Sequence, residues 1–305
     1  MNIRGFYWVL LIGLSLALLF QWTTEKRQEA VTEHLSSVMS AGFSLEDGYA
    51  SIENDDLVVV VSVPTGNIVE SRLKKYPVEN VQGSLGYRVF GESKESAFSY
   101  YFKSGFTNTS PVYSVRDLGK DYLVLSDDSL GLVKKISFSD SSYELSIYDE
   151  SLVGVNGQIF AGLYRTEGRA LDLKRNALDG GMMNNSSYEG VAISSEQDPY
   201  DTTRLSRIDE PKEVLTRSGW VAFVQKYFFA ALIGSDEYIY NYYVLPKESG
   251  VYRMGYTVET SSTSNLSISH EHRLFVGPKI RKDLMQRADN LELSIDMGWF
   301  WFLAQ

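Results

Sequence analysis

The chain has 305 residues, of which 44% are hydrophobic and 22% charged, so it is long enough to bury a large core. Its formal net charge of -10 argues against nucleic acid as a partner, because phosphate binding requires clustered Lys and Arg. The chain has no cysteine, which excludes disulfides and thiolate sites, and its 20 Tyr and 15 Phe favour strands over helices.

An unbroken uncharged run, FYWVLLIGLSLALLFQW, extends from Phe6 to Trp22. A run of about 17 residues can cross a thin bilayer, and Trp8 and Trp22 stand near its ends, where indole rings favour the headgroup layer. A cleaved signal peptide is the alternative, but the run ends in bulky residues rather than in the small ones that cleavage requires. We therefore predict an uncleaved transmembrane anchor over residues 6–22, preceded by a cytoplasmic tail of residues 1–5.

Residues 23–56 are predicted to form a tether, and strand patterns follow over residues 57–277. Many short strands with few helical interruptions are typical of a large antiparallel sandwich. No low-complexity linker divides the body, and Asp179–Ser187 and Glu196–Pro211 are its clearest polar connections. The strand candidates are Leu57–Val63, Ile68–Leu73, Tyr87–Phe90, Ala97–Lys103, Pro111–Val115, Tyr122–Leu125, Leu132–Phe138, Tyr143–Tyr148, Gln158–Tyr164, Tyr188–Ile193, Trp220–Tyr227, Tyr238–Leu245, Val251–Val258 and Leu266–Val276.

The pattern changes to a helical period over residues 278–297, which we predict to be a C-terminal helix and linker. Pro278 suits the first turn of a helix, and Leu284 and Leu291 lie on its apolar side. Basic residues cover the rest of the surface. They are either a solvated face on a helix packed against the sandwich, or a basic helix near anionic headgroups.

Residues 298–305, GWFWFLAQ, resemble the interfacial start of a second membrane segment. Trp299 and Trp301 lie there among apolar neighbours. Four of the five tryptophans therefore belong to the two terminal segments, which we expect to contact the bilayer.

The chain contains no P-loop, no dinucleotide-binding turn, no HExxH and no nucleophile elbow. His270 and His272 share one face of a strand candidate, where they could bind a metal with a carboxylate from elsewhere. The favoured interpretation is a polar, outward face of an edge strand. We predict no enzymatic activity and assign no catalytic, cofactor-binding or metal-binding residue.

Several stretches resemble the bacterial YidC membrane protein insertase family. The resemblance is clearest in the closing segment, with its VGPK and D-x-G-W-x-W-F patterns, and diffuse in the middle of the chain. The stretches are Leu57–Val63, Leu73–Pro77, Gly219–Phe228, Leu274–Lys279 and Leu291–Gln305.

This resemblance implies a β-supersandwich like that of galactose mutarotases, followed by a C-terminal helix. It places the anchor in a bacterial inner membrane and residues 57–277 in the periplasm. The family inserts and folds nascent membrane proteins, alone or beside the Sec translocon with SecD and SecF as neighbours. The functional groove of the family is built from later spans. We therefore expect the chain to be the N-terminal part of a longer protein, without insertase activity alone.

Pro278–Leu293 is the best candidate for a structural coupler between the sandwich and the membrane, and replacement of Leu284 and Leu291 by Asp should disturb it. Two alternatives remain open. One is a periplasmic sugar-binding or mutarotase-like domain, which would need a positioned acid and base. The other is a generic anchored structural protein.

Overall fold

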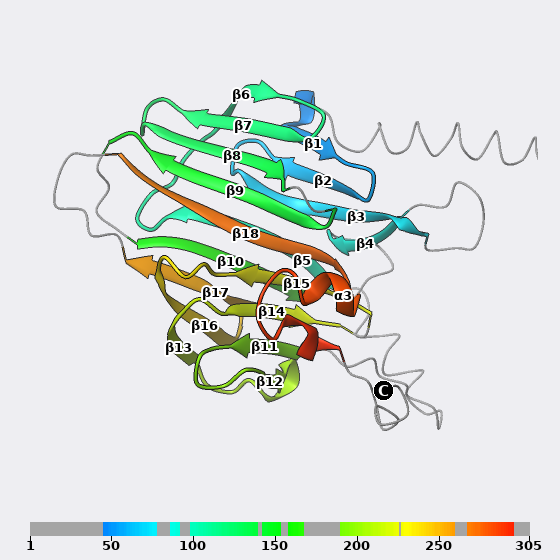
Figure 1. Cartoon of the computed structure of the whole chain (residues 1–305). Helices are drawn as coiled ribbons and strands as arrows, with labels where there is room; N and C mark the ends of the chain where they lie inside the picture. The colour runs from blue at the N-terminus through cyan, green and yellow to red at the C-terminus, as the bar shows by residue number, and fades with distance from the viewer. Residues whose placement is uncertain are drawn as a thin grey trace, which may run out of the picture.

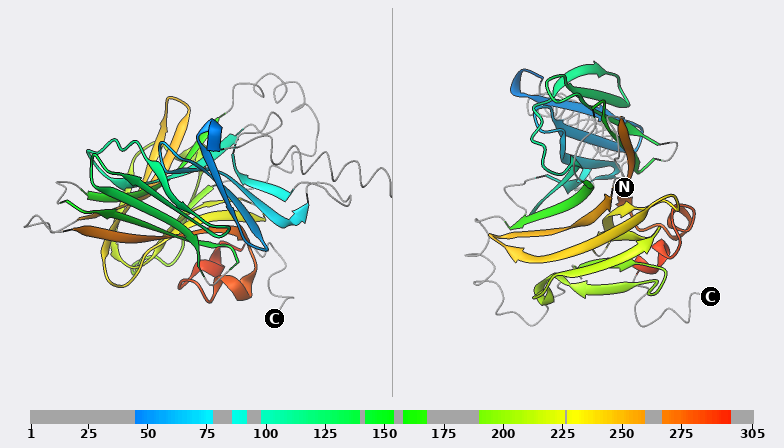
Figure 2. Two further views of the ribbon diagram at one scale, coloured as in Figure 1. Left: turned by 90° about the horizontal axis from the view of Figure 1, so that it is seen from above. Right: turned by 90° about the vertical axis from the view of Figure 1, so that its left-hand side faces the viewer.

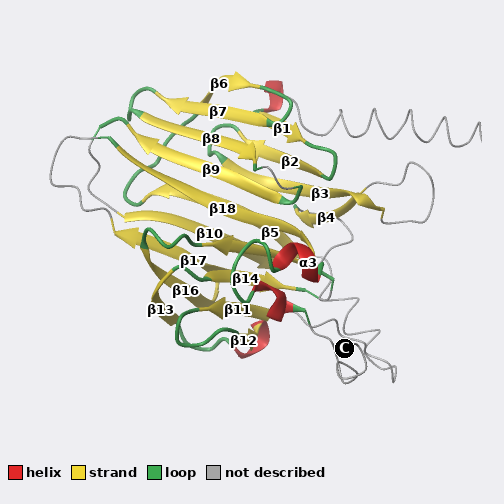
Figure 3. Ribbon diagram, viewed as in Figure 1, coloured by secondary structure: helices red, strands yellow, loops and turns green. Residues whose placement is uncertain are grey.

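The structure is a computed structural model that describes residues 45–77, 86–91, 98–139, 142–153, 158–167, 190–225, 227–259 and 267–295. These residues form two nine-stranded sheets in which every pairing is antiparallel (Figures 1 and 3). The first sheet contains β1 (Tyr49–Glu53), β2 (Leu57–Ser62), β3 (Asn67–Pro77), β4 (Gly86–Phe90), β5 (Phe98–Phe106), β10 (Gln158–Glu167), β13 (Lys212–Arg217), β16 (Ile239–Glu248) and β17 (Val251–Glu259). The second contains β6 (Ser114–Leu118), β7 (Tyr122–Asp127), β8 (Leu132–Phe138), β9 (Glu144–Ser151), β11 (Gly190–Ser194), β12 (Asp201–Arg204), β14 (Trp220–Val224), β15 (Phe228–Ile233) and β18 (Ile268–Pro278).

Strand order divides each sheet into an early and a late half. The first sheet runs β1-β2-β3-β5-β10-β17-β16-β13, with β4 also on β3, and the second runs β12-β11-β14-β15-β18-β9-β8-β7-β6. Strands from the first half of the chain therefore gather on one side and later strands on the other, as the colours of Figure 2 show. The junction between the halves is made by β10 in one sheet and β18 in the other.

Alternation of side chains explains how the two sheets share one core. In β14 the ring of Phe223 points to the first sheet, where it meets Tyr100 edge to face at 5.4 Å between ring centroids. Trp220, three residues earlier, points to the opposite face, yet it is completely buried. Every residue of β11 and β14 is buried, so these strands are covered on both faces and read as continuous apolar runs rather than alternating ones.

Helical structure among the described residues is limited to four short turns. They are η1 (Leu45–Asp47), η2 (Leu205–Arg207), α3 (Arg281–Leu284) and η3 (Leu291–Ser294). None of the described helices is long and apolar enough to span a bilayer. The predicted anchor, residues 6–22 with Trp8 and Trp22, lies outside the described residues, as do residues 298–305 with Trp299 and Trp301.

The prediction of a mostly β fold is confirmed, but the predicted tether ends too late. β1 lies within residues 23–56 and pairs with β2 through the register Tyr49↔Ser62 to Glu53↔Val58. Only Ala50 and Ile52 of β1 point into the core, and two inward residues are too few to identify a strand from alternation. The strands β12, β13 and β15 were also not predicted. β12 and β13 bury few of their residues, and no Gly, Pro, Asn or Asp marks the connection between β14 and β15.

The prediction that Pro278 begins a helix is wrong. Pro278 is the last residue of β18 and pairs with Phe228 at the end of the ladder, where a missing N–H is tolerated. In place of the helix and linker predicted over residues 278–297, the described residues form two short helices, α3 and η3. Asn290, in a left-handed conformation (φ 64°), directly precedes η3.

Candidate functional site

The predicted coupler is a folded strap that covers the outer face of the second sheet. We call residues 279–295 the strap; it begins directly after β18 and contains α3 and η3 (Figure 1). Leu284 and Leu291 are both 0% exposed and belong to the same hydrophobic core as the strands. Trp220 of β14 donates a hydrogen bond from Nε1 to the carbonyl oxygen of Asp289, at 3.0 Å. The buried indole thus gains a polar partner and fixes the strap to the sheet.

A cluster of three charged side chains holds the strap against β9 and β18. The buried carboxylate of Glu144 on β9 lies 2.8 Å from Arg273 Nε and 3.0 Å from Arg287 Nη1. Arg273 also donates from Nη2 to the carbonyl oxygen of Arg287 at 3.1 Å, and the Arg287 guanidinium lies 5.4 Å from the centroid of the Phe275 ring. One carboxylate therefore binds the strap to two strands, in partly buried geometry that strengthens charge-assisted hydrogen bonds.

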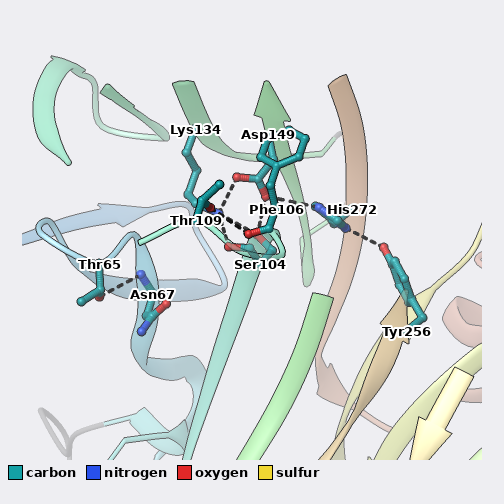
Figure 4. Close-up of polar contacts among 9 residues, drawn as sticks. All are labelled: Thr65, Asn67, Ser104, Phe106, Thr109, Lys134, Asp149, Tyr256 and His272. Carbon is teal, nitrogen blue, oxygen red and sulfur yellow. Dashed lines mark hydrogen bonds and ion pairs between the residues drawn. The ribbon is translucent and has the colours of Figure 1, made fainter. Parts of the chain in front are cut away.

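A second polar cluster lies inside the sandwich, between the two sheets (Figure 4). We call Ser104, Lys134, Asp149, Tyr256 and His272 the buried relay. Lys134 Nζ lies 2.6 Å from Asp149 Oδ1 and donates to Ser104 Oγ at 2.7 Å and to Ser104 O at 3.1 Å. Ser104 Oγ donates to Asp149 Oδ2 at 2.5 Å, so each carboxylate oxygen lies next to a polar or charged neighbour.

His272 extends the relay to the late half of the sandwich. Its Nε2 lies 3.2 Å from Asp149 Oδ2, and its Nδ1 lies 2.7 Å from the hydroxyl of Tyr256 on β17. The neighbouring carboxylate favours a proton on Nε2, which leaves Nδ1 to accept from the Tyr256 hydroxyl. The relay thus joins β5, β8, β9, β17 and β18, and so connects both halves of both sheets.

Burial and charge oppose one another at Asp149. Burial raises the pKa of its carboxyl, but Lys134 and His272 together outweigh that effect and hold the pKa well below its usual range. Asp149 is therefore ionised at neutral pH. Such a pair contributes little net stability compared with an apolar pair, but breaking it leaves an uncompensated buried charge.

His270 is buried next to the relay without a hydrogen-bond partner among the described residues. It is 2% exposed, and the rings of Tyr238, Tyr240, Tyr256 and His272 surround it at 4.7 to 6.2 Å between centroids. Burial, followed by repulsion from His272, lowers the pKa of His270 to about 3. His270 is thus a neutral core residue at physiological pH.

The interpretation of His270 and His272 as an outward face of an edge strand is wrong. The two rings do share a face, with centroids 4.7 Å apart, but β18 lies centrally between β15 and β9. Both side chains point to the first sheet, because Leu274 and Val276 continue the same inward alternation. The polar residues beside the two histidines in the sequence, Ser269, Glu271 and Arg273, made this strand look exposed.

The buried histidines do not offer an acid–base pair to a sugar, since neither reaches solvent. Within the described part of the chain, no group of three or more His, Asp or Glu could hold a metal ion. A cleft of about 440 Å³ lies between β11, β12 and β13, far from these histidines in strand order. Its lining includes Arg207 and Asp209 but no aromatic ring, unlike typical small-molecule sites.

Of the predicted site residues, Leu284 and Leu291 are buried in the strap, and Pro278 is the last residue of β18, directly before it. The buried relay was not predicted from the sequence. A signal for it exists: Leu132, Lys134 and Ile136 alternate inward on β8, as Leu145, Ile147 and Asp149 do on β9. Lys134 and Asp149 are also register partners, which alternation alone cannot establish without the strand pairing.

Comparison with known proteins places the chain in a recognised family. Residues 50–305 match the family model described as the YidC periplasmic domain. The membrane protein insertase YidC of Wigglesworthia glossinidia brevipalpis is 28% identical over 292 residues, which cover 86% of this chain and 52% of the relative. That of Hahella chejuensis is 28% identical over 314 residues, which cover 93% of this chain and 52% of the relative. The chain therefore spans about half the length of the curated relatives it matches.

Solved structures similar to the chain include galactose mutarotase-like proteins. A galactose mutarotase related enzyme from Lactobacillus acidophilus covers 75% of this chain and 97% of its own length, with a TM-score of 0.40 and 9% identity. A galactose mutarotase-like protein from Lactobacillus casei covers 76% and 100%, with a TM-score of 0.36 and 8% identity. At these scores the likeness says nothing about activity.

Removing one partner of the buried ion pair should destabilise the domain more than removing both. Lys134→Met is expected to lower the free energy of unfolding by about 3–5 kcal/mol, because Asp149 is left charged and buried. The double variant Lys134→Met/Asp149→Leu should recover much of that loss. Urea denaturation of the full chain in detergent measures both. Additive losses in the double variant would contradict a coupled pair.

His270 should make the domain acid-sensitive. Its pKa is about 3 when folded and about 6.5 when unfolded, so the unfolded state binds the extra proton and stability falls as pH drops from 6.5 towards 3. At pH 4 the loss from this residue is about 3 kcal/mol. His270→Phe should flatten the dependence of unfolding free energy on pH between 7 and 4. An unchanged slope would show that His270 does not carry it.

The two buried leucines of the strap should matter far more than their exposed neighbours. Leu284→Asp and Leu291→Asp each place a carboxylate in the core and should cost about 3–5 kcal/mol of stability or release the strap to proteolysis. Met285→Asp and Leu293→Asp, at 57% and 44% exposure, serve as matched controls and should change stability by less than about 0.5 kcal/mol. Equal protease sensitivity in all four variants would contradict the docking.

Proposed function

The chain belongs to the YidC periplasmic domain family, and from that premise we propose that it forms the anchored periplasmic part of a bacterial inner-membrane insertase. Residues 1–5 lie in the cytoplasm, residues 6–22 cross the inner membrane, and the β domain lies in the periplasm. Residues 298–305 begin a second membrane segment. The bulk of the chain is thus held between two membrane segments.

The whole protein assists the insertion, folding and assembly of nascent membrane proteins. It acts alone or beside the Sec translocon, with SecD and SecF as neighbours in the membrane. Its partners are membrane proteins and the lipid bilayer rather than nucleic acid, consistent with the net charge of -10. The domain performs no covalent chemistry, and the burial of its two strand histidines supports this assignment.

The observation that carries the proposal is the extent of the family match, from residue 50 through the strap to residue 305. The strap precedes the proposed second membrane segment in the chain, and its described part, up to residue 295, is docked on the sandwich. Leu284, Leu291 and the Trp220–Asp289 hydrogen bond attach it to one side, and Glu144 attaches it to the other. The docked strap fixes the place on the domain from which the chain continues towards that segment. We therefore assign the domain the role of an oriented accessory platform.

Cysteine labelling tests this topology, because the chain has no cysteine of its own. Leu152→Cys, at a position 54% exposed, should react with a membrane-impermeant maleimide in cells whose outer membrane alone is opened. Asn2→Cys should react only after the inner membrane is lysed. Both variants should label in detergent, which controls for reactivity.

Two outcomes would overturn the assignment. Equal labelling of both positions, or labelling of Asn2→Cys alone, would contradict a periplasmic domain on a cytoplasmic tail. Loss of the residue 2 label together with a shortened chain would show cleavage after the apolar run, and would remove the anchor.

A further inference from the structure

One end of the first sheet is a strand edge that no described strand covers. β13 pairs with β16 on one side through a continuous register, Lys212↔Val244 to Arg217↔Ile239, and is the last strand of its sheet on the other (Figure 1). Leu215, in the middle of β13, is 66% exposed. An edge strand presents unpaired backbone groups, so it can pair with another extended chain.

Among the described strands, the other ends of the two sheets are protected in ways that β13 lacks. β6 has a bulge in its pairing with β7, β12 has only four residues, and the N–H of Glu53 on β1 donates to the carbonyl oxygen of Lys120 at 2.7 Å. Bulges, short length and backbone bonds outside the sheet all limit pairing at an edge. β13 is longer than these three strands and has an unbulged ladder with an exposed leucine at its centre.

The outward side chains of β13 carry opposite charges on either side of this leucine. Glu213, Leu215 and Arg217 are exposed and alternate with less exposed residues, so they share the outer face of the sheet. Glu213 accepts a hydrogen bond from Asn241 Nδ2 at 3.1 Å, and Arg217 Nη1 donates to the carbonyl oxygen of Asp236 at 3.1 Å. Neither charge forms an ion pair with a described residue, so both remain available to a partner.

This outward row is complementary to itself. In an antiparallel pair with a two-fold axis at Leu215, the two leucines face each other and each Glu213 faces Arg217 of the other copy. Lys212 then faces Ser218, so no like charges oppose each other across the pair. Opposite charges placed directly across an antiparallel pair stabilise it.

The other charges near the edge do not oppose this pairing. Lys212 forms an ion pair with Asp201 of β12. Glu210 precedes β13, and Asp236 and Glu237 precede β16, which lies on the opposite side of β13 from the open edge. The net charge of -10 on each chain is repulsive at long range, but physiological salt screens charges more than about 8 Å apart.

The symmetry of the pair agrees with two chains held by one membrane. The two-fold axis that relates antiparallel neighbours in one sheet is perpendicular to that sheet. The strap covers the outer face of the second sheet, so the straps of both copies lie on the same side of the pair. Both chains therefore continue from one face towards the proposed second membrane segment; this step rests on the proposed function. A six-residue strand offers less than the about 1,200 Å² of a stable soluble interface, so confinement in one membrane is needed to favour the pair.

We propose that β13 is a self-association edge, through which two copies of the chain join their first sheets into one continuous sheet. The occupant of the edge is β13 of the second copy. Leu215 lies at the axis, and an ion pair between Glu213 and Arg217 lies on either side of it. The proposal goes beyond the proposed function, which assigns no partner to any strand of the domain.

Cysteine cross-linking of the full chain in proteoliposomes tests the register, because the chain has no cysteine of its own. Leu215→Cys should form a disulfide-linked dimer under mild oxidation, since directly opposed residues have Cα atoms about 4.5–5.5 Å apart. Glu213→Cys and Arg217→Cys should each fail alone, because each lies about 14 Å from its counterpart, yet they should cross-link when reconstituted together. Leu152→Cys, at 54% exposure, is the control for random collision.

Charge exchange tests the ion pairs. In the Leu215→Cys background, Arg217→Glu should reduce the dimer about tenfold, because each Glu213 then faces a second carboxylate. Glu213→Arg/Arg217→Glu should restore the dimer, because the exchange returns both ion pairs. Failure of the exchange to restore it would contradict the proposed pairing.

Flotation of the vesicles reports the anchor independently of the edge. If Leu215→Cys floats with the vesicles but forms no more dimer than Leu152→Cys, the self-association is overturned and the anchor stands. If the chain does not float, the anchor is overturned, and cross-linking of Leu215→Cys at raised concentration in detergent then decides the edge by itself. A dimer from Glu213→Cys alone would indicate a different register and contradict the proposal. In cell membranes, cross-linking of Leu215→Cys to another protein in place of its own copy would also overturn it.

Discussion

The carboxylate of Asp149 links the early and late halves of both sheets. It pairs with Lys134 on the neighbouring strand, accepts from Ser104 across the sheet interface, and lies against His272 of β18, which reaches Tyr256 on β17. Hydrophobic burial stabilises the sheets but does not choose between nearby registers. A buried ion pair does, because a one-residue slip in β8 or β9 would expose Lys134 or Asp149 and leave the other charge buried alone. The assembly of two half-sandwiches into one body depends on this constraint.

Once β18 is fixed, the outer face of the second sheet follows. The strand presents His272 and Leu274 inward and Arg273 and Phe275 outward, by simple alternation. Those outward residues are the ones on which the strap docks. β18 therefore packs core residues on one face and the strap on the other. The position of the strap is thus a consequence of the interior packing.

The sequence was sufficient to predict the β architecture and the family. It was not sufficient for features that depend on pairing between distant strands. β1 was missed because it contributes only Ala50 and Ile52 to the core, and His272 was placed outside because its strand neighbours are polar. Lys134 alternates with Leu132 and Ile136 in the sequence, but an inward lysine is plausible only once Asp149 is known to lie opposite. Local pattern identifies which face a residue shares, and tertiary pairing decides whether that face is buried.

The distribution of titratable groups also explains why an architecture with a histidine pair need not be an enzyme. An acid–base catalyst requires groups that reach a substrate and change protonation near the working pH. In this domain His270 meets neither condition, because its ring is enclosed by tyrosines and its pKa is about 3.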